Sequence, residues 1–203
     1  MVMLPGFNDN HLHTAAKFQA IAAAIPDEPC LIQGRRRFSY AEVDRRTNAL
    51  ANSFLAGGIQ RGDRVAVMER NSPEYLESYL AAQKLACVPL NINYKYQADE
   101  LRYVLNDSGA TVLVVHEDFL PVFDEIAHET PVRQVVVIGP GADAEPGAGR
   151  YSYDSAMTDG RERIDLPWEP PSNDDLIFLL YTGGTTGYPK GVMWDGQLYE
   201  ENW

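Results

Sequence analysis

Residues 64–91 have the sequence RVAVMERNSPEYLESYLAAQKLACVPLN, which contains a strand, a helix and a second strand in succession. The apolar runs Arg64–Met68 and Cys87–Leu90 predict the two strands. Ser72-Pro73 is typical of a helix start, because serine caps free amides and proline fits the first turn. The alternation continues with a helix at Ala98–Asn106, a strand at Thr111–Val115, a helix at Glu117–His128 and a strand at Gln134–Ile138. Apolar strands that alternate with amphipathic helices predict a parallel sheet covered on both sides. We therefore expect the α/β class, with a doubly wound, mostly parallel sheet and helices on both faces.

The segment before this alternation predicts a small helical and hairpin unit. It contains, in order, a helix at His11–Ile25, short strands at Cys30–Gln33 and Arg37–Phe38, and a helix that ends near Ala56. Ser39 and Glu42 match a capping box, in which the serine oxygen and the glutamate carboxylate accept free amides at a helix start. Gly57-Gly58 supplies the left-handed turn that ends a helix.

The segment after Ile138 breaks the alternation. Glycines and prolines at residues 139–150 and 159–173 predict irregular surface segments. A buried strand, Leu176–Tyr181, then leads directly into a glycine-rich loop. We divide the chain into an α/β unit, residues 1–175, and a strand–loop–strand segment, residues 176–203, after which the rest of a larger protein is absent.

The composition restricts the partners. The 203 residues include 17 basic and 29 acidic side chains, a net charge of -12, and 45% are hydrophobic. Such a surface repels nucleic acids and anionic lipids, so any bound phosphate must be held by a few local donors. The two cysteines are far apart, and we assign no metal-ligating residue. No secretory signal or run of membrane-spanning length is found, so we expect a cytoplasmic protein without integral membrane contact.

The loop at Thr182–Gly191, TGGTTGYPKG, carries the chemistry. Its glycines let the backbone approach a ligand closely, and successive amides in such a turn form an anion-binding concavity. Three threonine hydroxyls and Lys190 add further donors, a set that suits a pyrophosphate or triphosphate. The alternative is a solvated Gly/Thr turn. A Walker A loop is excluded, because Gly191 stands where that motif needs Ser or Thr.

The stretch Leu179–Lys190 resembles the AMP-binding signature of the adenylate-forming superfamily. Other stretches follow the family order: Phe38–Glu42, Gly62–Val65, Asn71–Glu74, Pro89–Asn91 and Glu100–Gly109. The chain looks most like fatty-acyl and steroid-acid CoA ligases of the actinobacterial type. The resemblance implies that a carboxylic acid reacts with ATP to give an acyl-adenylate and pyrophosphate, and that coenzyme A then displaces AMP.

The resemblance also implies roles for the loop. It would hold the β- and γ-phosphates while charge builds on the leaving pyrophosphate, and Mg²⁺ would share that charge. We assign this binding to the amides of Gly183, Gly184 and Gly187, the hydroxyls of Thr182, Thr185 and Thr186, and the ammonium of Lys190. Of these, Lys190 and Thr185 are the expected catalytic residues.

The chain departs from the family pattern at three places. Gly196 stands where the family usually has a histidine near the acyl channel, and Ala86 stands where a glycine is common, which we interpret as a mild packing change. The later family motifs do not occur before Trp203, so we expect these residues alone to be inactive. The alternative is a stand-alone nucleotide- or pyrophosphate-binding module, or a non-catalytic remnant.

Four other groups of residues carry simpler expectations. We expect His11 and His13 at a solvated terminus, His116 as a hydrogen-bonded loop histidine, and Arg35–Arg37 in a solvated hairpin turn. Tyr94, Lys95 and Tyr96 follow a strand, where cleft lining and core packing are equally compatible with the sequence.

Overall fold

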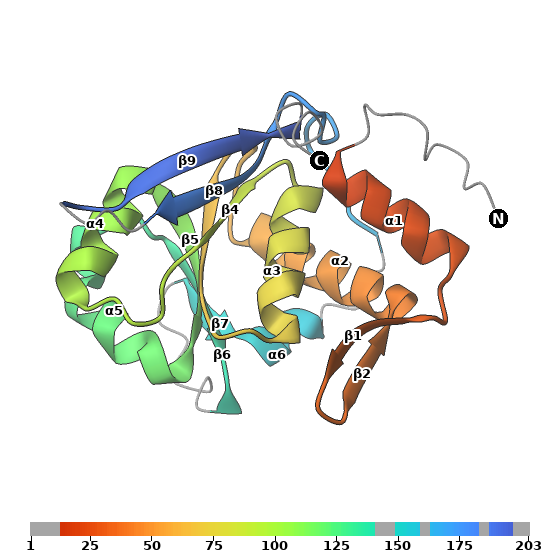
Figure 1. Cartoon of the computed structure of the whole chain (residues 1–203), viewed down its shortest axis with the longest axis horizontal. Coiled ribbons are helices and arrows are strands. Elements are labelled where there is room, and N and C mark those ends of the chain that lie inside the picture. Colours follow the sequence, from red (N-terminus) through yellow and green to blue (C-terminus); the bar gives the residue numbers. More distant parts are fainter. Residues whose placement is uncertain (1–12, 141–148, 159–162, 183–186, 197–203) are drawn as a thin grey trace.

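A computed structural model describes residues 13–140, 149–158, 163–182 and 187–196. Its main feature is a seven-stranded sheet with the order β7-β6-β5-β3-β4-β8-β9 (Figure 1). The strands are β3 (Arg64–Met68), β4 (Val88–Asn91), β5 (Ala110–His116), β6 (Gln134–Ile138), β7 (Arg150–Ser152), β8 (Leu176–Thr182) and β9 (Lys190–Asp195). All neighbours pair in parallel except β8 and β9, which form an antiparallel hairpin.

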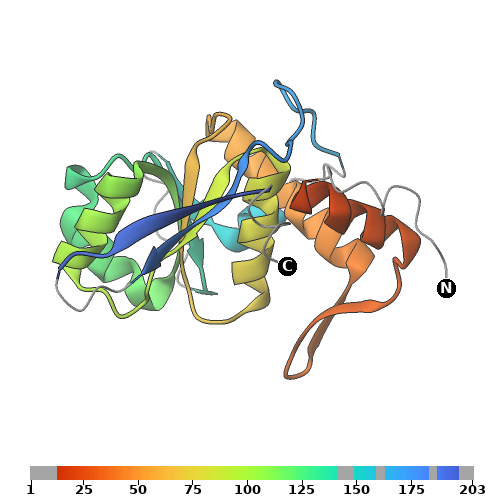
Figure 2. The ribbon, with the colours of Figure 1, turned by 45° about the horizontal axis from the view of Figure 1, so that its top comes forward.

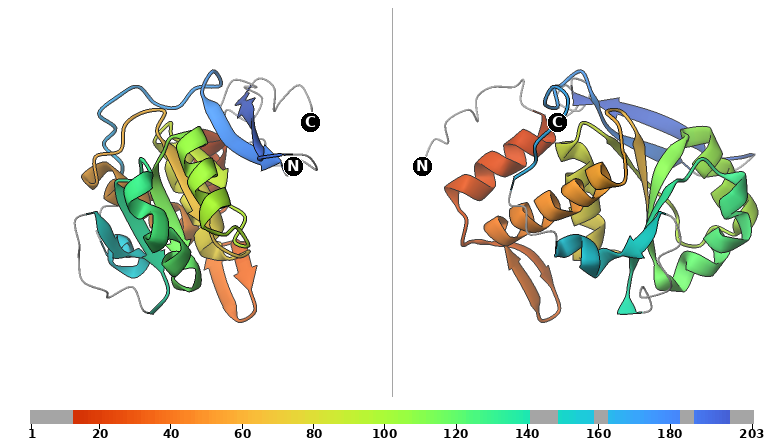
Figure 3. Two further views of the ribbon diagram at one scale, coloured as in Figure 1. Left: turned by 90° about the vertical axis from the view of Figure 1, so that its left-hand side faces the viewer. Right: turned by 180° about the vertical axis from the view of Figure 1, so that it is seen from behind.

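Helices cover both faces of this sheet, which confirms the predicted doubly wound class. The helices are α1 (Thr14–Ala24), α2 (Tyr40–Ala56), α3 (Pro73–Lys84), α4 (Ala98–Ser108), α5 (Leu120–Ile126) and α6 (Tyr153–Met157). In β3, Ala66 and Met68 join a buried cluster with α4 and α5, whereas Val65 and Val67 join one with α2, α3 and α6. This alternation explains why the strand is apolar on both faces. The two helical layers lie on opposite sides of the strands in Figure 1 and, from behind, in Figure 3.

The N-terminal segment forms the predicted helix and hairpin. The strands β1 (Pro29–Gln33) and β2 (Arg36–Ser39) project away from the main sheet (Figure 2). The capping box at the start of α2 is confirmed, because Glu42 N donates to Ser39 Oγ at 3.2 Å and Ser39 N donates to the Glu42 carboxylate at 2.7 Å. Gly58, with φ +82°, provides the left-handed turn after α2.

The helix start at Ser72-Pro73 is also confirmed. Tyr75 N donates to Ser72 Oγ at 3.2 Å, and Pro73 occupies the first helical position of α3. Serine thus satisfies an amide that the helix itself leaves free. The loop that follows β3 is therefore held against the start of α3.

Three sequence expectations need correction. Arg150 lies in β7, not in a loop, and β7 leads into α6. The expected helix at Glu117–His128 is divided into a 3₁₀ turn (Glu117–Phe119), α5 and a second 3₁₀ turn (Ala127–Glu129). The loop that we expected at Thr182–Gly191 is shorter, because Lys190 and Gly191 lie in β9 and pair with Thr182 and Tyr181 of β8. Residues 163–173 contain no helix or strand, as expected, whereas 141–148 and 159–162 lie outside the described residues.

No helix in the described part of the chain is long and apolar enough to cross a membrane. The boundary that we place at residue 175 precedes β8, which pairs with β4 in the same sheet. The proposed division of the chain stays a prediction.

Candidate functional site

The predicted phosphate-binding loop connects β8 to β9. Thr182 ends β8 and Lys190 begins β9, and these two residues are direct partners across the hairpin. Thr182 Oγ1 donates to the carbonyl oxygen of Lys190 at 3.5 Å, a long bond that closes the base of the loop. Both residues are exposed, and Lys190 forms no ion pair with any described residue. The ammonium group is therefore available to an anionic ligand.

The described part of the loop includes only some of the predicted binding residues. Gly183, Gly184, Thr185 and Thr186 lie outside the described residues. Gly187 is exposed, and a Cβ built on it meets no atom within 4 Å. Neither space nor a positive φ angle therefore requires glycine at position 187 in this conformation.

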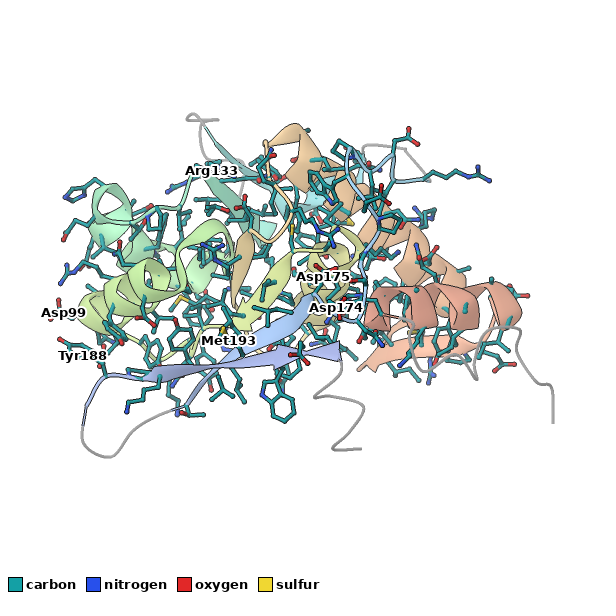
Figure 4. All side chains as sticks on the ribbon, turned by 90° about the horizontal axis from the view of Figure 1, so that it is seen from above. Asp99, Arg133, Asp174, Asp175, Tyr188 and Met193 are labelled. Carbon is teal, nitrogen blue, oxygen red and sulfur yellow. The ribbon has the colours of Figure 1, made fainter. Side chains whose placement is uncertain are left out.

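Both stems of the loop contact α4. On the first stem, the Tyr181 hydroxyl donates to Asp107 Oδ2 at 2.7 Å. Burial of the phenol and the nearby Asp107 carboxylate raise the pKa of Tyr181. On the second stem, the Tyr188 ring stacks on Tyr103, with 4.4 Å between the ring centroids. Figure 4 shows Tyr188 beside the start of α4, where Asp99 is labelled.

A cavity of about 860 Å³ adjoins the loop. It lies at the carboxyl ends of three neighbouring strands, β3, β4 and β8, and is also lined by residues of α3, α4 and the loop. The lining residues are Glu69, Arg70, Asn71, Tyr75, Asn91, Ile92, Asn93, Tyr94, Tyr96, Glu100, Tyr181, Gly187 and Pro189. Open α/β sheets bind ligands at the carboxyl ends of their strands, which is where this cavity lies. The loop and the cavity thus form one candidate site.

The cavity contains polar residues that the sequence reasoning missed. The Arg70 guanidinium lies 4.7 Å from the centroid of the Phe119 ring and donates to Asp118 at 2.9 Å. Glu69 is buried, and burial raises the pKa of its carboxyl group. Both residues directly follow the buried strand β3, a position that could have been recognised from the sequence.

Tyr94 and Tyr96 line the cavity, and Lys95 lies between them in the chain. Tyr94 also stacks on Phe119, with 5.6 Å between the ring centroids, and Tyr96 packs against the buried core. The two interpretations of this segment, cleft lining and packing, therefore both apply.

Gly196, which directly follows β9, has no room for a side chain. A Cβ at this position would lie 2.8 Å from the carbonyl oxygen of Asn173 and 2.9 Å from its Cα atom. The amide of Gly196 also donates to that carbonyl at 3.0 Å. The position that we compared with the family histidine is thus packed against backbone.

Ala86 differs from the expected mild packing change. It is the one non-glycine residue with a positive φ, 53°, in the described part of the chain. This left-handed conformation places Cβ close to the following carbonyl oxygen, so the departure from glycine is one of backbone strain.

The structure corrects the expectation for His13 and part of that for Arg35–Arg37, and it confirms the expectation for His116. His13 is 2% exposed rather than solvated, and its Nδ1 accepts the Ala15 amide at the start of α1. Burial lowers its pKa to about 4. Arg35 lies in the hairpin turn and is exposed, as expected. Arg36 and Arg37 are also exposed but lie in β2, and Arg36 pairs with Glu74. His116 Nδ1 accepts the Asp118 amide at 3.1 Å. His11 lies outside the described residues.

The comparison with protein families identifies residues 18–197 as an AMP-binding enzyme. The chain is 34% identical over 181 residues to the 3-oxocholest-4-en-26-oate–CoA ligase of Rhodococcus rhodochrous. The matched region covers 88% of this chain and 32% of that relative. It is 37% identical over 194 residues to the medium-chain acyl-CoA ligase Mig of Mycobacterium avium, with 87% of this chain and 34% of the relative covered. The chain thus spans about a third of the length of these relatives.

Solved structures share the fold. A long-chain-fatty-acid–CoA ligase from Archaeoglobus fulgidus matches with a TM-score of 0.77 and 30% identity, over 90% of this chain and 36% of that chain. The anthranilate CoA ligase AuaEII, solved with anthranoyl-AMP, matches with a TM-score of 0.83 and 24% identity, over 92% of this chain and 35% of that chain. Because the family match covers most of the sequence, this chain belongs to the AMP-binding enzyme family, whose members named here are acyl-CoA ligases.

Proposed function

We propose that this chain supplies the phosphate-binding part of an ATP-dependent ligase that joins a carboxylic acid to coenzyme A. The observation that carries the proposal is the pairing of Thr182 with Lys190 at the carboxyl edge of the sheet, beside the 860 Å³ cavity. This pairing places a hydroxyl, and an ammonium group that has no ion-pair partner among the described residues, at the base of a glycine-rich loop. On a chain with a net charge of -12, such local donors are needed to hold a polyphosphate.

In the proposed reaction, a carboxylate oxygen attacks the α-phosphorus of ATP and the bond to the β-phosphate breaks. Pyrophosphate leaves, and the loop donors stabilise the charge that develops on it. We assign this role to Thr182, Lys190 and the amide of Gly187. Outside the described residues, we assign it also to Gly183, Gly184, Thr185 and Thr186. The thiol of coenzyme A then attacks the acyl carbonyl, and AMP departs.

The loop donors bind phosphate oxygens rather than metal ions, so we place Mg²⁺ in its complex with ATP. In the described residues, no group of three or more His, Cys, Asp or Glu could hold a metal ion. Mg²⁺ bound to the phosphate oxygens would neutralise charge on the leaving pyrophosphate.

We propose a fatty or steroid acid as the substrate class, because the relatives from Rhodococcus rhodochrous and Mycobacterium avium carry those names. A 3-hydroxybenzoate–CoA ligase from Aromatoleum sp. (strain CIB) is 32% identical over 173 residues, with 85% of this chain and 32% of that relative covered, so aromatic acids are the competing class. With ATP and coenzyme A as cosubstrates, the proposed reaction takes place in the cytoplasm.

The test is ATP–pyrophosphate exchange by the protein expressed from its complete reading frame. Medium- and long-chain fatty acids, 3-oxocholest-4-en-26-oate and 3-hydroxybenzoate are compared as substrates. We expect exchange with a fatty or steroid acid, and a loss of about 100-fold in the rate for Lys190→Ala, the typical effect of removing one charge-stabilising donor. Lys17→Ala, on α1, is the matched control and retains the rate.

Two results would contradict the proposal. Polyphosphate binding without exchange for any acid would instead indicate the stand-alone binding module. An unchanged exchange rate in Lys190→Ala would remove the assigned role of that residue. Acyl-adenylate formed by residues 1–203 alone would refute the separate expectation that these residues are inactive by themselves.

A further inference from the structure

We propose that α4 positions the phosphate-binding loop through two unequal contacts, a fixed hydrogen bond from Tyr181 to Asp107 and a releasable stack of Tyr188 on Tyr103. The inference rests on the proposed function, since it assigns positioning residues to the same loop. It gives a role to the stretch Glu100–Gly109, which the sequence singled out without a function.

The two contacts come from one face of α4. Tyr103 and Asp107 are four residues apart, so their side chains lie one above the other on the helix surface. Tyr103 contacts Tyr188, two residues after the undescribed part of the loop, whereas Asp107 contacts Tyr181, which precedes Thr182. One helix face thus holds the chain on both sides of the loop.

The opposite face of α4 is fixed to the rest of the domain. Leu101, Val104 and Leu105 are fully buried against the sheet. At the C-terminal end of the helix, Arg64 donates to the carbonyl oxygens of Ser108 at 2.6 Å and Gly109 at 2.9 Å, which satisfies acceptors that the helix leaves free. The helix is therefore a rigid support for the loop.

The first contact is the more restricted one. Tyr181 packs against the buried core, and its ring also lies over Gly191, its partner in β9, where an added Cβ would be 3.2 Å from the ring. A Cβ at position 191 would therefore make a tight contact with this ring, so the ring has little room on that side. Since the pKa of Tyr181 is raised, the phenol stays protonated and donates throughout the neutral range.

The second contact is more exposed. Tyr188 is 63% exposed although its ring stacks on Tyr103, and a Cβ built on Gly187, the residue before it, meets no atom within 4 Å. A stack of this kind holds a segment by a small free energy. It orders the second stem before a ligand arrives and can still separate when the ligand leaves, because little else covers the ring.

Amide exchange tests the contacts without a ligand. We expect Tyr103→Ala to accelerate exchange at Gly187 and Tyr188, and Tyr103→Phe to retain the wild-type rates because the ring remains. Asp107→Ala should accelerate exchange at Thr182, whereas Asp107→Asn keeps an acceptor oxygen. Unchanged exchange in both alanine variants would overturn the proposal, and melting temperatures would confirm that the variants are folded.

Binding of Mg²⁺–tripolyphosphate to the protein from its complete reading frame tests the positioning role. We expect Tyr103→Ala and Tyr188→Ala each to weaken binding about twofold to tenfold, as the loss of one stack implies. The double variant should bind no more weakly than either single variant, and Tyr188→Phe should bind like the wild type. Additive losses, or a lower melting temperature with unchanged affinity, would show a merely structural role.

The same experiment separates the two proposals. If wild-type protein binds tripolyphosphate, Lys190→Ala abolishes binding and Tyr103→Ala binds normally, the positioning inference is wrong and the proposed function stands. If the wild type does not bind, or if Lys190→Ala binds as well as the wild type, the proposed function fails and the positioning inference fails with it.

Discussion

Charged side chains between α2, α3 and α6 are buried and paired, whereas the ammonium group of Lys190 at the β8–β9 hairpin is exposed. Glu77 is fully buried and accepts from Arg46 Nε at 2.5 Å and from the Tyr153 hydroxyl at 2.6 Å. The Lys84 ammonium is also buried, and its donors reach the side-chain oxygens of Asp44, Thr47 and Asn48, each at 2.7 Å. Lys190, in contrast, is exposed and has no ion-pair partner in the described ranges.

This difference separates structural cations from a cation that can bind a ligand. A buried charge costs free energy unless its partners satisfy it, so Arg46 and Lys84 have no remaining capacity for a phosphate. Lys190 requires no partner for folding, because water solvates it. The comparison therefore predicts that substitutions in the helical layer change stability, whereas substitutions at the tip of the hairpin change binding.

The largest expected effect comes from Glu77→Ala. It leaves the Arg46 guanidinium without its carboxylate in a largely buried place, which should lower the free energy of unfolding by about 3–5 kcal/mol. Urea denaturation measures the change. The matched control is Asp118→Ala, which breaks the exposed pair with Arg70 and should change stability far less, because water solvates both partners. Equal losses in the two variants would contradict the comparison.

The free energy of unfolding should fall in acid because of His13, which lies at the start of α1. Because its pKa falls from 6.5 to about 4 on folding, the unfolded chain binds the proton more strongly between these values. Stability should therefore decline as the pH falls from about 6.5 to 4, by roughly 2–3 kcal/mol from this residue. His13→Asn keeps an N-cap acceptor and removes the titration, so its unfolding free energy should decline less over that range. Parallel pH profiles would show that His13 is not responsible.

The sequence predicted the parts of this fold that depend on neighbouring residues. The strand β6 was identified from Gln134–Ile138, and the start of α3 from Ser72-Pro73, because apolar runs and caps act locally. The short strand β7 was missed, since its three residues are stabilised by pairing with β6 rather than by their own pattern. The burial of His13 likewise depends on packing that no local motif encodes.

The candidate site shows the same limit. The glycine- and threonine-rich composition located the loop, and Thr182 and Lys190 do lie together at its base. The support from α4 depends on a hydrogen bond between Tyr181 and Asp107, which are 74 residues apart in the chain. Such a contact follows only from the order of the strands in the sheet, where β8 lies beside β4 and so near the helix that follows β4.

Gly187 and Gly196, which lie before and after β9, allow the same comparison between an open position and a packed one. Gly196→Ala places a Cβ against the backbone of Asn173 and should cost about 1–3 kcal/mol of unfolding free energy, since backbone cannot move aside easily. Gly187→Ala, just before β9, meets no atom within 4 Å and should change stability by less than about 0.5 kcal/mol. Denaturation of the two variants in parallel would decide this, and a similar loss in both would show that Gly187 is as tightly packed as Gly196.

The smallest effect on the free energy of unfolding is expected for Ala86→Gly. Replacing a buried alanine by glycine normally destabilises a protein, but here the change should be nearly neutral. Ala86→Gly loses a buried methyl group and gains freedom in the unfolded chain, but it relieves the left-handed strain of about 1–2 kcal/mol. Ala82→Gly, inside α3, loses a similar methyl group and helix propensity with no strain to relieve. Its unfolding free energy should therefore be about 1–2 kcal/mol lower than that of Ala86→Gly. Equal values would mean that the φ of 53° at Ala86 carries no strain, so that the family glycine at this position would need another explanation.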